Sequence, residues 1–359
     1  MTALLIVLTL GLGYANGAND VSKGIATLVG SGVTDYRRAV LWGSGWTIAG
    51  GVLAGLVASG MVETFSGQAL LVSAPTGVSF PIAVACGAIG WLVVATLTGL
   101  PVSTTHALLG GLCGAGIAAQ GTSGVLWGAV GWKAALPLAV SPLLSLALMA
   151  VLFPLIRLGY RRFERYCVCL ERQELSLAVP EGGAVMAASK ALTVIAGADC
   201  PPQVVSRVNL LDSLHWLSSG LTGLFRGLND TPKILALGVA AAAATGLSQP
   251  SLYVLLALSM GAGSYLAGAR VTGTLAARVT RMTPGEGFAA NLVTSVLVAS
   301  ASGFSLPVST THVSSSAIIG LGLHNRSVRW RTVSDMLLAW LITVPVAGGI
   351  GWVAYLVLP

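Results

Sequence analysis

The chain has 359 residues, of which 9% are charged and 55% are hydrophobic, and its mean hydropathy is +0.84. Soluble domains carry about 25% charged residues, so this composition excludes a soluble enzyme. It also excludes a disordered chain, which would need the opposite composition. At about 20 apolar residues per span, the chain has room for about eight to twelve helical segments. We therefore predict an all-α polytopic membrane protein.

The formal net charge of +7 indicates membrane topology and no nucleic-acid partner, because Lys and Arg collect in cytoplasmic loops. Loops near 61–79, 121–132 and 247–250 carry almost no charge. Basic residues instead gather at 35–38, 157–207, 270–281 and 326–331. We expect the basic loops to lie inside and both chain termini outside the plasma (inner) membrane.

A charged segment divides the chain into two hydrophobic halves that resemble each other. We predict a first transmembrane repeat over 1–157, a cytoplasmic linker loop over 158–207 and a second repeat over 208–359. Residues 13–23 and 223–233 share Gly, Gly, Asn, Asp and Lys at a constant offset of 210. The run Leu-Pro-Val-Ser-Thr-Thr-His occurs at 100–106 and again at 306–312. The shared order indicates an internal duplication.

The loop charges place the two halves in opposite orientations. Inverted-topology repeats are typical of secondary transporters, in which the substrate binds at the interface between repeats. In each half we expect a segment broken at the Asn-Asp motif, over 3–30 and 208–247. A plain span follows, then two helices meeting at the Pro-Val-Ser-Thr-Thr-His turn, over 80–120 and 286–323, and a closing span.

Each Pro-Val-Ser-Thr-Thr-His turn presents three consecutive hydroxyl groups. Proline disfavours helix in the residue before it, and Ser or Thr then caps the helix that follows. Such a helix terminus offers free N–H groups and about half a positive charge, which suits an oxyanion. The alternative is that the hydroxyls only cap and pack helices. Two copies that face each other favour an anion site formed by Ser103, Thr104, Thr105, Ser309, Thr310 and Thr311.

Both Asn-Asp motifs place ionisable and amide side chains inside apolar segments, namely Asn19, Asp20 and Lys23, and Asn229, Asp230 and Lys233. Ionisable residues at membrane depth are functional candidates, and carboxylate and amide oxygens bind Na⁺ or carry protons in transporters. Each Lys follows its Asp by three residues, so on a helix the two share one face. The alternative is a neutralised Asp–Lys pair. His106 and His312 either relay protons or satisfy nearby backbone groups.

Gly17-Ala18-Asn19-Asp20-Val21, Gly227-Leu228-Asn229-Asp230 and the doubled Pro-Val-Ser-Thr-Thr-His resemble the signatures of the inorganic phosphate transporter (PiT) family. The resemblance covers both halves and leaves out the linker. It implies a cation-coupled phosphate symporter without a cofactor, often homodimeric. It also implies that the hydroxyl turns, Asn19 and Asn229 bind phosphate. Within the Asn-Asp motifs, we assign coupling to H⁺ or Na⁺ to Asp20, Lys23, Asp230 and Lys233, with a possible Na⁺ site at Asn19, Asp20, Asn229 and Asp230.

The sequence departs from the family where sodium coupling is concerned. Many sodium-coupled members carry glutamates at two positions that align here with Thr47 and Asn291, and Lys23 replaces a small or amide residue. An added ammonium group and two missing carboxylates make a poor sodium site. We therefore favour proton coupling.

Three other functions compete with phosphate symport. A sulfate permease of the same fold would bind a similar anion, but sulfate carries no proton for Asp20 or Asp230 to accept. A passive anion channel would not need the Asn-Asp motifs. An intramembrane serine hydrolase would pair Ser103 with His106, or Ser309 with His312, but it would normally have one asymmetric site and not two equal copies.

Overall fold

The computed structural model describes residues 1–57, 59–73, 75, 77–163, 166–178, 184–196 and 204–358. The first half forms α1 (Thr2–Asp20), α2 (Ser22–Gly30), α3 (Tyr36–Val57), α4 (Ser59–Phe65), α5 (Ser79–Thr98), α6 (Thr104–Gln120), η1 (Thr122–Gly124), α7 (Trp127–Ala129), η2 (Val130–Ala135) and α8 (Leu136–Phe163). The second half forms α9 (Leu210–Ala244), α10 (Gln249–Ala267), α11 (Ala269–Ala277), α12 (Pro284–Gly303), α13 (Thr310–His324) and α14 (Trp330–Val357). Both halves are helical, as predicted.

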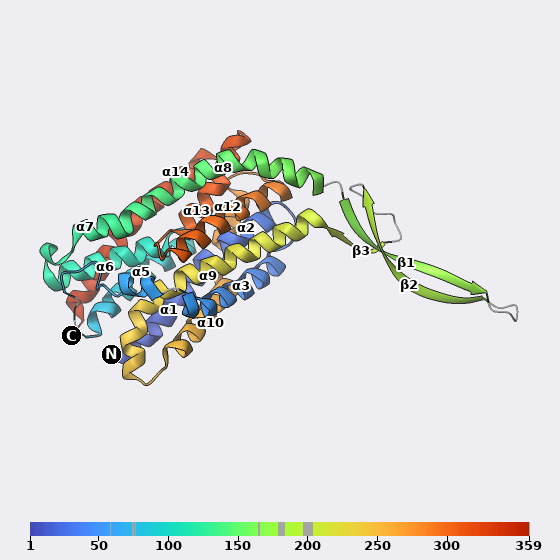
Figure 1. Ribbon diagram of the computed structural model, residues 1–359. Helices are drawn as coiled ribbons and strands as arrows, with labels where there is room; N and C mark the ends of the chain where they lie inside the picture. The colour runs from blue at the N-terminus through green and yellow to red at the C-terminus, as the bar shows by residue number, and fades with distance from the viewer. Residues whose placement is uncertain are drawn as a thin grey trace.

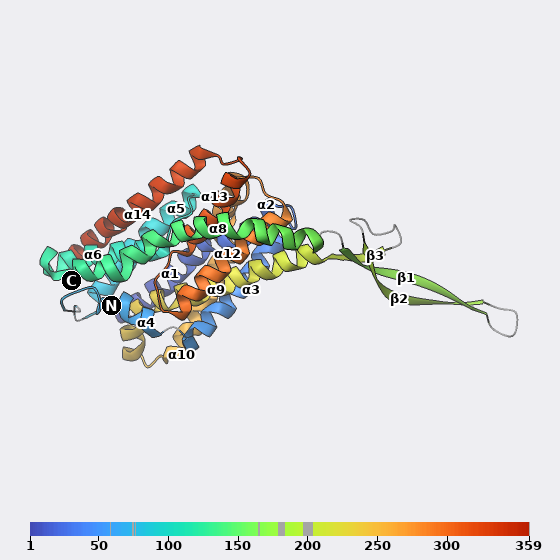
Figure 2. The same cartoon turned by 45° about the horizontal axis from the view of Figure 1, so that its top comes forward.

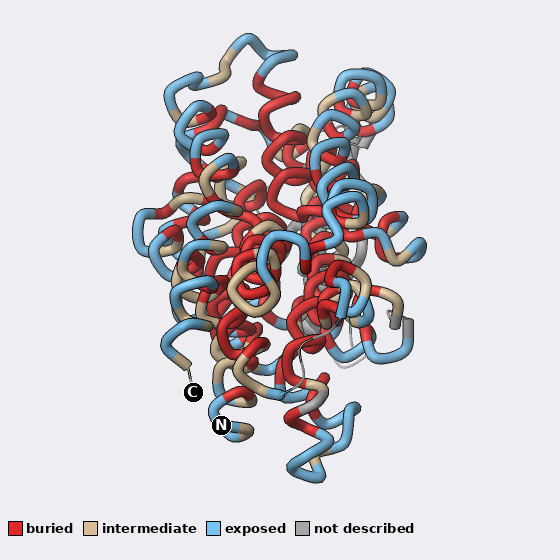
Figure 3. The backbone as a smooth tube through the Cα atoms, turned by 90° about the vertical axis from the view of Figure 1, so that its left-hand side faces the viewer, coloured by how far each residue is buried: buried red, intermediate tan, exposed pale blue. Residues whose placement is uncertain are grey.

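Six helical segments among the described residues are long and apolar enough to cross a membrane: Thr2–Gly30, Tyr36–Leu56, Ser79–Thr98, Trp127–Arg161, Gln249–Ala267 and Trp330–Val357. Large apolar side chains on their outer faces are exposed, including Leu56, Leu158 and Leu341. Figure 3 shows the buried residues gathered along the middle of the bundle and the exposed ones around it. The chain is a multi-pass integral membrane protein.

The linker differs from the predicted loop, because its described residues form strands. β1 (Tyr166–Ala178) pairs antiparallel with β2 (Ala184–Ala196) and with β3 (Val204–Asn209), in the order β2-β1-β3. Polar and apolar residues alternate over 174–177, which is the period of a strand, although the charge of the segment favoured a loop. The sheet projects from one end of the bundle, and both termini lie at the other end (Figures 1 and 2).

We predicted that the helix is broken at each Asn-Asp motif. This prediction is wrong for the second half, and in the first half the interruption between the two helices is one residue long. Between α1 and α2, Val21 keeps a helical backbone (φ −58°, ψ −32°) and donates its N–H to Gly17 O. Helix α9 continues through Asn229 and Asp230. In both motifs the backbone therefore keeps its helical path.

The two predicted turns are confirmed, one between α5 and α6 and the other between α12 and α13. Ser103 and Ser309 have extended backbones and are the N-caps of α6 and α13. Their hydroxyls accept hydrogen bonds from the backbone N–H groups of His106 (3.2 Å) and His312 (3.1 Å). The same residues therefore end the turn in the same way in both halves.

Helices of the two halves interlock through closely packed glycines. Helix α1 packs on α10, and α9 packs on α3, so that the first helix of each half packs on a helix of the other half. A Cβ atom at any of the contact glycines would lie within 2.5 Å of a backbone oxygen of the partner helix: Gly17 at Met260, Gly263 at Tyr14, Gly227 at Thr47 and Gly50 at Leu224. These contacts hold the two Asn-Asp motifs side by side.

Candidate functional site

The two Asn-Asp motifs meet inside the bundle at the side chain of Asn16, which was not among the predicted site residues. Asn16 Nδ2 lies 3.0 Å from Asp20 Oδ2 and 3.3 Å from Asp230 Oδ2. It also donates to Thr104 Oγ1 at 2.9 Å, so the first hydroxyl turn joins the same group. One amide thus connects two carboxylates from opposite halves of the chain.

Arg226 occupies in the second half the position that Asn16 occupies in the first. Its Nη1 donates to Asn16 Oδ1 at 3.1 Å, and its Nη2 donates to Thr47 Oγ1. Arg226 was also missed by the sequence analysis. It could have been found by the criterion that selected Asp20 and Asp230, because it too is an ionisable residue within an apolar segment.

Five charged residues are buried together, each no more than 1% exposed: Asp20, Lys23, Arg226, Asp230 and Lys233. Lys23 pairs with Asp20, and Lys233 Nζ lies 3.1 Å from Asp230 Oδ1. Arg226 forms no ion pair with any residue that the structure describes. With three cations and two anions, this buried cluster carries one excess positive charge. An unbalanced buried charge is costly, so the cluster attracts an anion.

The two lysines differ in their surroundings. Lys233 Nζ donates to Thr105 Oγ1 at 2.8 Å, to Val308 O at 3.0 Å, and to the side-chain oxygens of Asn229 and Asp230. It therefore ties α9 to both hydroxyl turns. Lys23 has the Asp20 carboxylate as its sole partner among the described residues.

The hydroxyl turns bind each other across the centre of the bundle. Thr105 Oγ1 donates to Val308 O at 3.3 Å, and Thr311 Oγ1 donates to Val102 O at 2.7 Å. Thr310, which precedes Thr311 in the sequence, is buried. Thr104 lies against Asp20, with Oγ1 3.5 Å from Oδ2. Of the six predicted hydroxyls, Thr104 and Thr105 thus contact the charged cluster, at Asp20 and at Lys233.

Asn19 and Asn229 fasten each Asn-Asp motif to the helix that precedes the nearby turn. Asn19 Nδ2 donates to Thr96 Oγ1 at 3.2 Å, and Asn229 Nδ2 donates to Ser302 Oγ at 2.9 Å. Thr96 and Ser302 are themselves equivalent in the two repeats, at the offset of 206 that relates the turns. The amide oxygen of Asn19 accepts from Val102 N at 3.1 Å, and that of Asn229 accepts from Lys233.

The oxygens that were candidates for Na⁺ already accept from protein donors. The amide oxygens of Asn19 and Asn229 are engaged, and each carboxylate is paired with a lysine. At the two positions where the sequence analysis expected glutamate in sodium-coupled members, Thr47 accepts from Arg226, and Asn291 Nδ2 donates to Gly24 O at 3.1 Å and to Thr27 Oγ1 at 2.7 Å. A sodium ion at the Asn-Asp motifs would have to displace the protein donors from these oxygens.

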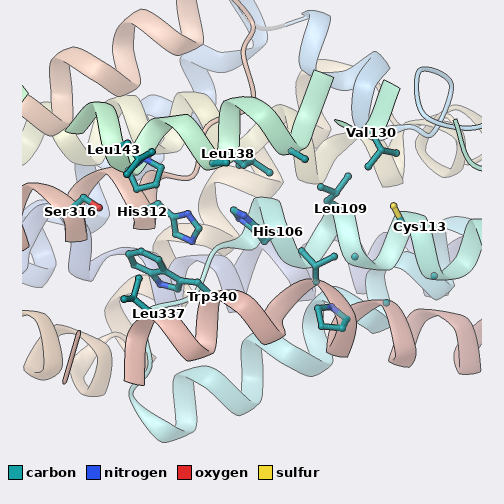
Figure 4. Close-up of a pocket in the computed structure, with 18 of the residues that line it drawn as sticks. His106, Leu109, Cys113, Val130, Leu138, Leu143, His312, Ser316, Leu337 and Trp340 are labelled. Carbon is teal, nitrogen blue, oxygen red and sulfur yellow. The ribbon is translucent and has the colours of Figure 1, made fainter. Parts of the chain in front are cut away.

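A large cavity lies beside the turns but does not contain the charged cluster. It has a volume of about 850 Å³ and is lined mainly by apolar residues of α6, α8, α13 and α14. His106 and His312 lie together at its wall, with ring centroids 4.4 Å apart, and His312 stacks on Trp340 at 4.0 Å (Figure 4). No Lys, Arg, Asp or Glu is among the described residues that line it, so it is poorly suited to phosphate.

Known proteins resemble this chain over most of its length. The sequence model of the phosphate transporter family matches residues 16–351. A protein of Mycobacterium bovis named "Probable low-affinity inorganic phosphate transporter" is 29% identical over 361 residues, which cover 98% of this chain and 76% of the relative. A Rhizobium meliloti protein of the same name is 26% identical over 359 residues, covering 98% and 94%.

A solved structure described as a sodium-dependent phosphate transporter has a similar fold. The TM-score is 0.77, with 99% of this chain and 98% of the other covered. The two sequences are 20% identical, so this likeness concerns the fold alone.

Proposed function

The chain belongs to the phosphate transporter family, and we propose that it is a secondary active symporter that moves inorganic phosphate together with a proton. The observation that carries this proposal is the buried cluster of three cations and two anions, formed where the Asn-Asp motifs of the two halves meet. The family consists of transporters and not enzymes. In keeping with this, Ser103 and Ser309 are engaged as helix caps by backbone N–H groups.

Alternating access at the interface between inverted repeats is the proposed mechanism. Helix α1 runs from the end that holds the termini toward the end that holds the sheet, and α9 runs the opposite way (Figure 1). The glycine contacts of α1 with α10 and of α9 with α3 are also related by exchange of the two halves. Both features support an inverted arrangement with the substrate at its centre.

The proposed orientation places the sheet in the cytoplasm and both termini outside the plasma membrane. The basic residues of 157–207, 270–281 and 326–331 support it, because positive loops remain inside. The family resemblance further implies a homodimer, which light scattering after size-exclusion chromatography would measure.

Phosphate binds, in this proposal, where Thr104, Asn16 and Arg226 converge. The site is closed in this structure, because all five charged side chains are buried. On opening, the hydroxyls of Thr105, Thr310 and Thr311, the capping serines and the amides of Asn19 and Asn229 exchange their present partners for phosphate oxygens. A charged hydrogen bond in such a site contributes about 1.5–3 kcal/mol.

Proton coupling is favoured over sodium coupling by the two buried lysines. Each ammonium supplies the positive charge that a bound sodium ion would otherwise supply beside Asp20 or Asp230, and it repels that ion. The proton travels on phosphate as H₂PO₄⁻ or on one of the two carboxylates.

Sulfate is the second candidate substrate, and the charge of the cluster favours phosphate. One H₂PO₄⁻ neutralises the single excess charge, whereas sulfate would leave one negative charge buried. Uptake of labelled phosphate into proteoliposomes, with sulfate as competitor, tests the substrate. Concentrative phosphate uptake that a tenfold excess of sulfate leaves unchanged is the expected result, and uptake of sulfate in preference to phosphate would reject the proposal.

A further inference from the structure

We propose that Lys23 and Arg226 supply the positive charges that bind the anion, whereas Lys233 is a positioning residue that holds the two hydroxyl turns. This inference rests on the proposed function and assigns unequal roles to two lysines that the internal duplication makes equivalent. Both are buried to the same extent and both pair with the Asp three residues earlier. They differ in how many acceptors surround them.

The Lys233 ammonium is saturated by the protein. It has three N–H groups and four oxygen acceptors, from Thr105, Val308, Asn229 and Asp230. Two of these acceptors belong to different hydroxyl turns, so the lysine links both turns to α9. No N–H group is left to receive a substrate oxygen unless these contacts break.

The Lys23 ammonium and the Arg226 Nε group are not saturated. Lys23 Nζ has the Asp20 carboxylate alone, and Arg226 Nε has no hydrogen-bond partner among the described residues. Buried charged donors without acceptors carry a large desolvation cost, which a bound anion would relieve. Lys and Arg donors are also the usual ligands of phosphate oxygens.

Lys23 and Arg226 belong to one network of contacts, which also reaches Asp230 through Asn16. Lys23 pairs with Asp20 directly, and Arg226 reaches Asp20 through Asn16, which accepts from the guanidinium and donates to the carboxylate. Lys23 and Arg226 are thus linked through Asn16 and the Asp20 carboxylate, and both have donors that the protein leaves unused. An oxyanion that binds beside Asn16 and Asp20 could accept from both cations.

The asymmetry has a local cause in the first half. The acceptors that correspond to those of Lys233 are used by other donors. Asn19 Oδ1, the counterpart of Asn229 Oδ1, accepts from Val102 N. Val308 O accepts from both Thr105 Oγ1 and Lys233 Nζ, whereas its counterpart Val102 O accepts from Thr311 Oγ1 and receives no bond from Lys23. The amide oxygen of Asn19 is therefore the acceptor that Lys23 loses to another donor.

A matched pair of double variants tests this assignment. Asp20→Asn/Lys23→Gln and Asp230→Asn/Lys233→Gln each remove one ion pair, and each leaves the net charge of the cluster unchanged. Equilibrium binding of inorganic phosphate to the purified full chain is measured by calorimetry, and thermal unfolding is measured on the same samples. Transport is not the readout, because both carboxylates have proposed roles in coupling.

The first variant should bind phosphate at least tenfold more weakly and unfold at nearly the wild-type temperature. The second should lose less phosphate affinity than the first and unfold at a lower temperature than the first. Equal losses of binding in both variants, or a larger loss in the second, would overturn the assignment. Absence of phosphate binding by the wild-type chain would instead reject the proposed function itself.

A third variant decides the matter if removal of the Lys233 pair prevents folding. Arg226→Gln leaves both lysines and both carboxylates in place. It should retain the wild-type unfolding temperature and lose at least tenfold in phosphate affinity. Unchanged affinity in Arg226→Gln would contradict the proposal, whatever the behaviour of the double variants.

Discussion

Asn16 and Arg226 hold equivalent positions in the two halves of the chain and are hydrogen-bonded to each other, with Nη1 donating to Oδ1 at 3.1 Å. Equivalent residues of an internal duplication meet in this way where the two halves of the bundle contact each other. Because one of the two is an amide and the other a guanidinium, the centre of the bundle gains a positive charge that no carboxylate balances. This charge is the physical basis of the proposed anion site.

Replacement of Asn16 by Asp should weaken phosphate binding at least tenfold without unfolding the protein. The new carboxylate would lie against Arg226 and balance the excess charge, so an anion would no longer be attracted. Calorimetry with inorganic phosphate measures the affinity, and the unfolding temperature should fall, because the new carboxylate replaces the amide that donates to Asp20 and Asp230. Wild-type affinity in Asn16→Asp would show that the net charge of the cluster does not govern binding.

Asp20→Asn and Asp230→Asn should each abolish coupled uptake and leave the fold intact. Both carboxylates are buried beside lysines at the contact of the two halves, which is where a proton can be taken up and released as the site alternates. Uptake driven by a pH gradient is compared with the exchange of labelled phosphate at equilibrium. Normal gradient-driven uptake by both variants would remove the carboxylates from the coupling mechanism.

Thr104→Val should reduce phosphate affinity about tenfold, because it removes a hydroxyl that lies against Asp20 and Asn16. A lost hydrogen bond to a charged group costs about 1.5–3 kcal/mol. Thr104 is not a cap, so the loss would not reflect a weakened helix. Thr98→Val is a matched control, since Thr98 bonds backbone oxygens of its own helix. Equal affinities of the two variants would mean that the turn hydroxyls serve packing only.

Local signals in the sequence predicted the turns well. A proline followed by Ser and Thr determines where a helix starts, and Ser103 and Ser309 occupy the expected cap positions. The Asn-Asp motifs were harder to interpret, because the partners of their side chains lie on other helices and on the turns. Thr105 and Val308 supply acceptors to Lys233, and no spacing within either motif reveals them.

The internal duplication identified some residues of the candidate site and missed others. It located Asp20 and Asp230 as a pair, but Asn16 and Arg226 differ in residue type and so escaped a search for identical positions. Lys23 and Lys233 have different surroundings because of contacts with Val102 and Val308. These two valines are equivalent in the sequence repeat, so the sequence does not show the difference. The sequence repeat therefore located the site, and the equivalent positions at which the two repeats differ in residue type give the site its net charge.

The most direct measurement is uptake of labelled phosphate into proteoliposomes with the sodium and pH gradients imposed separately. We expect accumulation when the outside is acidic and sodium is absent, because the proton accompanies phosphate into a site whose lysines replace sodium. A sodium gradient at equal internal and external pH should give no accumulation. Strong accumulation driven by sodium alone, with no response to the pH gradient, would contradict the account.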